Sequence, residues 1–124
     1  MGQTSNLIIR NDSIVSDIIK QRDPLCILKL TGCTHYTDDP AHVWGRGNMA
    51  TRWDLRAVYG GCRSCHSYID THPKHKKEIF HVIMGEDMYN EIKKLSNTNA
   101  KYLPYELKQI YKDLKTKLCE IQNT

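Results

Sequence analysis

The sequence lacks any stretch that would direct the chain into or across a membrane. Residues 1–6 contain neither a positively charged segment nor a long apolar one, so we expect no secretory signal peptide. No later stretch is apolar enough to span a bilayer, and the sequence has no internal repeat, linker or low-complexity tract. These absences predict a single cytoplasmic domain over residues 1–124, with no membrane partner.

The composition excludes an intrinsically disordered chain. Hydrophobic residues make up 40% of the sequence and charged residues 26%, which is typical of a globular protein. The net charge of +4 is compatible with a polyanionic partner, although many proteins with other functions carry as much charge. Its distribution is more informative, because acidic residues are sparse in the middle of the chain and basic residues and histidines gather there. They are Arg46, Arg52, Arg56, Arg63, Lys74, Lys76 and Lys77, with His35, His42, His66, His72 and His75.

Apolar residues at helical spacing predict a short helix near the start of the chain. The pattern follows residues 11–13, which are polar, and any of these three could cap the helix. Asp23 precedes Pro24, and a residue before proline is displaced from the α region, so the helix should end near Arg22. The apolar stripe consists of Ile14, Val15, Ile18 and Ile19.

Three further helices are predicted after Pro73. Gly85 is expected just past the end of the first, residues 97–99 end the second, and Pro104 stands in the first turn of a final amphipathic helix. Residues 25–61 are rich in Gly, Thr, Asp and Pro, with brief β-compatible pieces at 28–31, 41–44 and 57–59. This loop-rich region needs an additional element to hold it together.

The cysteines predict that this element is a zinc ion. In a reducing compartment, clustered cysteines bind metal more often than they pair as disulfides. Cys62 and Cys65 have the two-residue spacing of a zinc knuckle, and Cys26 and Cys33 are the upstream candidates for the second pair. Their longer separation indicates either an insertion in that knuckle or replacement of one thiolate by His35, and we favour the two cysteines. Cys119 is expected to lie outside the site.

Three segments together resemble a known family of nucleases. They are Ala41–His42 through Arg46, then Thr51-Arg-Trp-Asp54, and then Cys62-Arg-Ser-Cys65-His66. This combination is similar to the HNH (ββα-metal, His-Me finger) endonucleases, in particular to the NinG/Rap-type recombination nucleases of bacteriophages. The resemblance covers about residues 22–73 and implies an α+β fold. We expect a small zinc-stabilised ββα-metal core over residues 22–73, with a helix before it and a helical extension over residues 74–124.

The resemblance also implies a metal-dependent DNA endonuclease that hydrolyses phosphodiester bonds in the cytoplasm, which would be the host's if a phage encodes the chain. In the family, a strand histidine deprotonates water and a residue early in the helix binds one divalent ion. Carried over, His42 is the general base and His66 a ligand of Mg²⁺ or Mn²⁺. Both ions are hard cations suited to phosphoryl oxygens. The implied partner is DNA, and the recombination relatives favour branched DNA.

Two alanines stand where the family often has polar residues. Ala41 occupies the position before the base, where many members have Asp, and Ala57 the position of the Asn that orients the base. Asp39 points to the same side of an extended strand as Ala41, and Asp54 lies in the hairpin region, so either could supply a carboxylate to the metal or the base. Two hypotheses therefore stand: an active nuclease, and a catalytically degenerate zinc-dependent DNA-binding or adaptor protein.

Four arginines are the candidate DNA contacts. The planar guanidinium matches phosphate oxygens, and these residues flank the expected site of cleavage. Trp44 and Trp53 are interpreted as core residues, because this half of the chain has few other large apolar side chains. The apolar stripe of the last helix fits either intramolecular packing or a homodimer. The arginines are Arg46, Arg52, Arg56 and Arg63.

A remote alternative is a c-type cytochrome. Cys62-x-x-Cys65-His66 matches the signature for covalent attachment of haem, and Met84 or Met88 could be an axial ligand. The missing export signal and the second cysteine pair, which would have no role in a cytochrome, argue against this reading.

Overall fold

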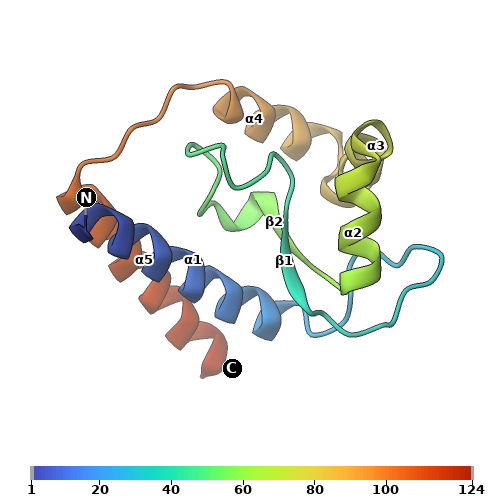
Figure 1. The fold of residues 1–124 in the computed structure, drawn as a ribbon, viewed down its shortest axis with the longest axis horizontal. Helices are drawn as coiled ribbons and strands as arrows, with labels where there is room; N and C mark the ends of the chain where they lie inside the picture. Colours follow the sequence, from blue (N-terminus) through green and yellow to red (C-terminus); the bar gives the residue numbers. More distant parts are fainter. Residues whose placement is uncertain (1, 124) are drawn as a thin grey trace.

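The computed structural model describes residues 2–123, with side chains from residue 4 onward, and it is an α+β fold (Figure 1). A two-stranded hairpin lies between a pair of long helices and the shorter helices of the middle of the chain. Within the described residues, no helix is both long and apolar enough to cross a membrane. The elements are α1 (Gly2–Arg22), β1 (Asp39–His42), η1 (Leu55–Ala57), β2 (Val58–Gly61), α2 (Arg63–Thr71), α3 (Pro73–Met84), α4 (Glu86–Ser96) and α5 (Pro104–Gln122).

Helix α1 ends at Arg22 as predicted, but the prediction that it begins at residues 11–13 is wrong. Two of the polar residues there, Asn11 and Asp12, make tertiary contacts in the middle of the helix instead of capping it. Asn11 is fully buried, and its side-chain nitrogen donates to the carbonyl of Leu107, 3.2 Å away. Asp12 accepts hydrogen bonds from Arg52 and Trp53. Polar residues in front of an apolar stripe can therefore belong to a packed face, not only to a cap.

Helices α1 and α5, the first and last of the chain, lie side by side and run in the same direction (Figure 1). Their apolar faces form one of the two core clusters found among the described residues, and this cluster also contains Trp53 and Val58. The Arg10 guanidinium lies 3.8 Å above the ring of Tyr111 and covers one side of this contact. The expected helical extension is thus divided, because α5 packs against α1 whereas α3 and α4 pack elsewhere.

The hairpin joins the two halves of the molecule. Strands β1 and β2 pair antiparallel, with Asp39 opposite Gly61 and His42 opposite Val58. Helix α2 follows β2 directly, so the chain order is strand, strand, helix. Residues 28–31 form no strand, because this segment turns around the cysteines, where the Leu30 amide donates to the Cys65 sulfur.

The second core cluster lies between the hairpin and helices α2, α3 and α4. Phe80 is fully buried at its centre and packs near Tyr59, with 5.8 Å between the ring centroids. Gly85, at φ +82°, separates α3 from α4, as its position in the sequence predicts. Pro104 occupies the first turn of α5, and the Glu106 side chain accepts from the Leu103 amide to cap it. Trp53 is a buried member of the other core cluster, as predicted, whereas Trp44 is only partly buried and packs against this one.

Candidate metal centre and the His42 cavity

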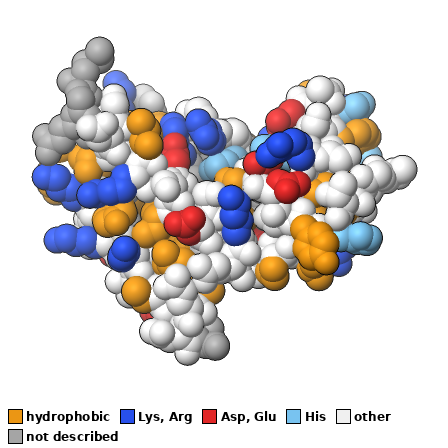
Figure 2. Space-filling view, turned by 60° about the horizontal axis from the view of Figure 1, so that its bottom comes forward, with side chains coloured by type: hydrophobic (Ala, Val, Ile, Leu, Met, Phe, Trp, Pro, Cys, Tyr) orange, Lys and Arg blue, Asp and Glu red, His pale blue; other side chains and the backbone are white. Residues whose placement is uncertain are grey.

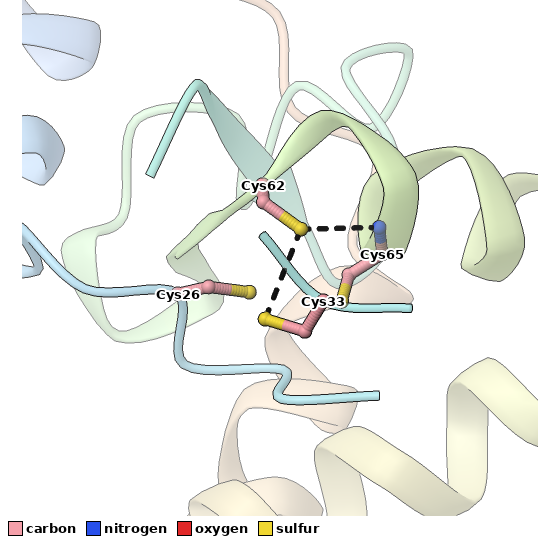
Figure 3. A group of neighbouring side chains, drawn as sticks. All are labelled: Cys26, Cys33, Cys62 and Cys65. Carbon is pink, nitrogen blue, oxygen red and sulfur yellow. Dashed lines mark hydrogen bonds between the residues drawn. The ribbon is translucent and has the colours of Figure 1, made fainter. Parts of the chain in front are cut away.

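Four cysteines from distant parts of the chain converge on one point (Figure 3). The sulfurs of Cys26, Cys33, Cys62 and Cys65 all lie within 4.8 Å of one another, and those of Cys33 and Cys62 are 3.9 Å apart. A tetrahedral zinc ion with Zn–S bonds of about 2.3 Å requires sulfurs about 3.8 Å apart. The cluster could therefore hold a metal ion such as zinc, as the spacing of the cysteines predicts.

Backbone amides hold the sulfurs in place. Cys62 is the N-cap of α2 and accepts from the Cys65 amide, 3.4 Å away, and from the Thr34 amide, 3.5 Å away. The His35 amide donates to Cys33 at 3.3 Å, so His35 contributes its backbone to the cluster while the four close ligand atoms are all sulfurs. The loop between the upstream cysteines turns back through residues with positive φ, which accommodates the insertion in that knuckle. These residues are Lys29 and Gly32, and His35, two residues after Cys33, also has a positive φ.

The electrostatics of the cluster suit a cation. Burial opposes ionisation of Cys62, but the amides of Thr34 and Cys65 outweigh it and lower the pKa of the Cys62 thiol to about 6. Burial raises the pKa of Cys65, and the neighbouring Cys62 sulfur raises it further. Four thiolates at this distance repel one another, so a divalent cation is the group that would let all four ionise together.

The positions of these thiols do not fit the haem alternative. Cys62 and Cys65 are almost completely buried and lie among the other two cysteines, so their sulfurs are not open to a porphyrin. Met84 is buried in the core cluster. Cys119 is exposed on α5, outside the metal cluster, as expected.

A separate cavity of about 430 Å³, lined by none of the four cysteines, lies at the junction of β1, α2 and α3. Polar and charged side chains dominate its walls. Figure 2 shows one face of the molecule, on which basic, acidic and histidine side chains lie next to one another. Of the residues predicted to act in catalysis or bind DNA, four line this cavity, and Asp70 and Lys76 join them although sequence reasoning missed both. The lining consists of Asp39, Pro40, His42, Gly45, Arg46, His66, Asp70 and Lys76.

His42 ends β1 and is only 9% exposed. Its Nε2 lies 3.1 Å from the carbonyl oxygen of Arg52. A carbonyl can only accept a hydrogen bond, so Nε2 carries the proton and Nδ1 keeps a lone pair. Burial lowers the pKa of His42 to about 4, so the imidazole is neutral at neutral pH. The orienting contact expected from a side chain at position 57 is thus made by a backbone carbonyl, and Ala57 is buried in the core.

His66, in the first half of α2, lies between two carboxylates. Its Nδ1 is 3.6 Å from Asp39, and its Nε2 is 3.6 Å from Asp70 one turn later on the same helix. The structure therefore brings Asp39, and not Asp54, to the histidines. Asp54 caps η1 by accepting from the Arg56 amide and forms an ion pair with the Arg56 guanidinium. Asp70 could have been found from its spacing of four residues from His66.

The four predicted DNA-binding arginines differ in their surroundings. Arg46 lines the cavity. Arg63 is 82% exposed, and its Nε lies 3.8 Å from Asp39. Arg56 pairs with Asp54 and Glu91, and Arg52 pairs with Asp12 at 2.6 Å with only 15% of its side chain exposed. Arg46 and Arg63 therefore lie at or near the cavity, whereas carboxylates elsewhere hold Arg52 and Arg56.

Comparison with known proteins identifies no relative. No protein-family model, no curated protein and no solved structure matches this chain. The likeness to HNH nucleases therefore stays a prediction from the motifs around His42 and His66.

Proposed function

We propose that the protein is a metal-dependent DNA endonuclease of the HNH type, with its reaction centre in the His42 cavity. One observation carries this proposal: a buried, neutral and oriented imidazole shares a cavity with a second histidine that lies between two carboxylates. Hydrolysis of a phosphodiester needs a base for water and a cation for the phosphoryl oxygens. The residues of the cavity can supply the base and can hold the cation.

His42 is the proposed general base. Its Nδ1 takes a proton from water, and the water oxygen forms a bond to phosphorus as the bond from phosphorus to the leaving oxygen breaks. The leaving oxygen keeps the electron pair of that bond and takes a proton from solvent. The low pKa of His42 makes it a weak base but keeps it unprotonated over the whole physiological range. A bound phosphodiester would add negative charge beside the ring and raise that pKa towards neutrality.

His66 and Asp39 are the proposed ligands of the catalytic ion, with Asp70 as a carboxylate on the other side of the imidazole. A nitrogen and carboxylate oxygens fit Mn²⁺, and the oxygens fit Mg²⁺. Such an ion, when bound, stabilises negative charge on the phosphoryl group. Arg46 and Lys76 line the same cavity and provide positive charge for the phosphate. Burial lowers the pKa of Lys76.

The four cysteines are the proposed ligands of a structural zinc ion. Zinc there would tie the loop of residues 24–38 to the start of α2, for an apparent binding free energy on the order of 10 kcal/mol. Because His66 directly follows Cys65, the zinc would also fix the helical turn that carries His66. Zinc is thus proposed to shape the cavity while a different ion takes part in the chemistry.

The proposal is tested by incubating purified protein with linear, nicked and four-way-junction DNA in Mg²⁺ or Mn²⁺. We expect cleavage that is lost in EDTA and reduced about 10²- to 10⁴-fold by His42→Ala, as for removal of a general base. His75→Ala is the control, because His75 is exposed and lies outside the cavity lining. Cleavage that survives His42→Ala would remove His42 as the base. Preference for the junction would identify branched DNA as the substrate.

A catalytically inactive DNA-binding protein is the second candidate. It is favoured by Ala41, which is fully buried and gives the metal site no carboxylate at the position where the family often has one. This function predicts DNA binding and bound zinc without cleavage of any of the three substrates. The same experiment separates it from the nuclease when binding is measured alongside cleavage.

A further inference from the structure

Asp12, in the middle of α1, connects this helix to the segment that leads from β1 to η1. Its Oδ2 accepts from Arg52 Nη2 at 2.6 Å, and its Oδ1 accepts from Arg52 Nε at 3.0 Å. The same Oδ1 accepts from the indole Nε1 of Trp53 at 2.9 Å. One carboxylate therefore holds two consecutive residues of a segment 40 positions away in the sequence.

The residue that Asp12 holds by its side chain is also the residue that holds His42 by its backbone. The Arg52 carbonyl is the group that lies 3.1 Å from His42 Nε2. A guanidinium bound through two nitrogens has a fixed plane and direction, unlike one bound at a single point. Fixing both the Arg52 guanidinium and the neighbouring Trp53 indole restricts the rotation of the peptide group between them. That peptide group contains the Arg52 carbonyl.

We propose that Asp12 is a positioning residue for His42, acting through Arg52 and Trp53 to aim the Arg52 carbonyl at Nε2 and so to select the imidazole tautomer with a lone pair on Nδ1. The proposed tautomer follows from the contacts of Asp12 with Arg52 and Trp53 and from the contact of the Arg52 carbonyl with His42. Its consequence for catalysis rests on the proposed nuclease function. Arg52 is thereby assigned to the support of His42 and not to DNA.

The contacts of the Arg52 guanidinium distinguish these two roles. Nε and Nη2 are bound to Asp12, and Nη1 lies 3.8 Å from the sulfur of Met49. A phosphate could reach this guanidinium only by displacing Asp12, and the pair is largely buried, with side-chain exposures of 15% and 19%. Displacement would leave a carboxylate among Trp53 and the core of α1 without its partner, which is costly.

The first measurement is the tautomer of His42, observed through the ¹⁵N chemical shifts of its ring nitrogens at pH 7 in the zinc-loaded full-length protein. The wild type is expected to show protonated Nε2 and unprotonated Nδ1. Asp12→Asn, which removes the charge and one acceptor oxygen, is expected to give a mixture of both tautomers. Asp17→Asn is the matched control, because Asp17 is exposed on the same helix. Its spectrum should equal that of the wild type.

A second variant covers the case in which Asp12→Asn does not fold. Trp53→Phe keeps an aromatic ring at this position but lacks the indole N–H that binds Asp12, so it should shift the tautomer in the same direction by a smaller amount. An unchanged tautomer in Trp53→Phe and in any folded Asp12→Asn protein would overturn the proposal and leave Asp12 with a purely structural role.

The kinetic measurement separates this inference from the proposed function. If the wild type cleaves DNA, Asp12→Asn should lower kcat about 10- to 100-fold, as is typical for loss of an outer supporting contact, with KM nearly unchanged. A rise in KM at constant kcat would instead identify Arg52 and Asp12 as part of the DNA surface and overturn the proposal. Absence of cleavage by the wild type would refute the nuclease, while the tautomer measurement would still decide the role of Asp12.

Discussion

Acid is expected to destabilise the folded protein through His42. Burial lowers the pKa of this residue from 6.5 to about 4. As the pH falls below 6.5, the unfolded chain takes up a proton at position 42, whereas the folded chain resists it until the pH approaches 4. The unfolded state therefore binds more protons in this interval, and the free energy of unfolding falls with the pH. At about 1.4 kcal/mol for each pH unit, the loss between pH 7 and pH 4 is about 3 kcal/mol.

The assay is urea unfolding at pH 7, 6, 5 and 4, followed by tryptophan fluorescence, for the wild type and for His42→Gln. Glutamine does not titrate. From pH 7 to pH 4, the unfolding free energy of the His42→Gln variant should therefore fall by about 3 kcal/mol less than that of the wild type. His75→Gln is the control, because His75 is exposed and should leave the pH dependence of the wild type unchanged. Zinc content is measured at each pH, because acid also protonates the cysteines in all three proteins.

The prediction would be refuted if the unfolding free energies of the wild type and of His42→Gln changed in parallel with pH. Parallel curves would mean that His42 has the same pKa in the folded and unfolded chains. The imidazole would then be accessible to water, contrary to its 9% exposure and its contact with the Arg52 carbonyl. A loss of stability that follows zinc content alone would lead to the same conclusion.

Two further predictions concern the metal cluster and the hairpin. Elemental analysis of the wild type should give about one zinc per chain. Cys62→Ser should lose this zinc and Cys119→Ser should keep it. Zinc retained by Cys62→Ser would contradict the four-cysteine site. Gly60→Ala should reduce the free energy of unfolding by about 1–3 kcal/mol, because the new Cβ would lie 2.6 Å from Thr37 Oγ1 and 2.8 Å from a backbone oxygen. Gly47→Ala, with open space around its Cβ, should change it by less than about 0.5 kcal/mol; equal effects of the two glycine substitutions would show that Gly60 is not closely packed.

Local patterns in the sequence were sufficient to predict most of the helices. The boundaries at Arg22, Gly85 and Pro104 agree with the structure because each depends on the residue itself: the proline ring fixes φ, and glycine accepts positive φ. The start of α1 was wrong because Asn11 is polar yet fully buried, and its partner, Leu107, lies on the other long helix. Such a contact leaves no trace in the local pattern.

The cysteine cluster was predictable, whereas half of the cavity was not. Thiols have few roles other than binding metal or forming disulfides, so one close pair and two further upstream cysteines already indicate a metal site. Carboxylates are common on every surface, so Asp39 and Asp54 could not be distinguished before the fold was known. In the structure, Asp54 forms an ion pair with Arg56, whereas Asp39 lies next to His66. Lys76 reaches the cavity only because α3 packs against α2, which no spacing in the sequence reveals.

The environment of His42 shows why a motif does not determine the role of its residues. Arg52 in the Thr-Arg-Trp-Asp segment fits a phosphate contact by side-chain chemistry, yet its guanidinium binds Asp12 and its carbonyl binds His42. Every residue has a carbonyl, so a backbone contact of this kind places no demand on the identity of the residue that makes it. Ala57, where the family often has an orienting side chain, therefore does not by itself imply a loss of orientation at His42. What the chain requires instead is a fixed peptide group at position 52, and the residue that fixes it, Asp12, lies on a helix outside the resembling segment.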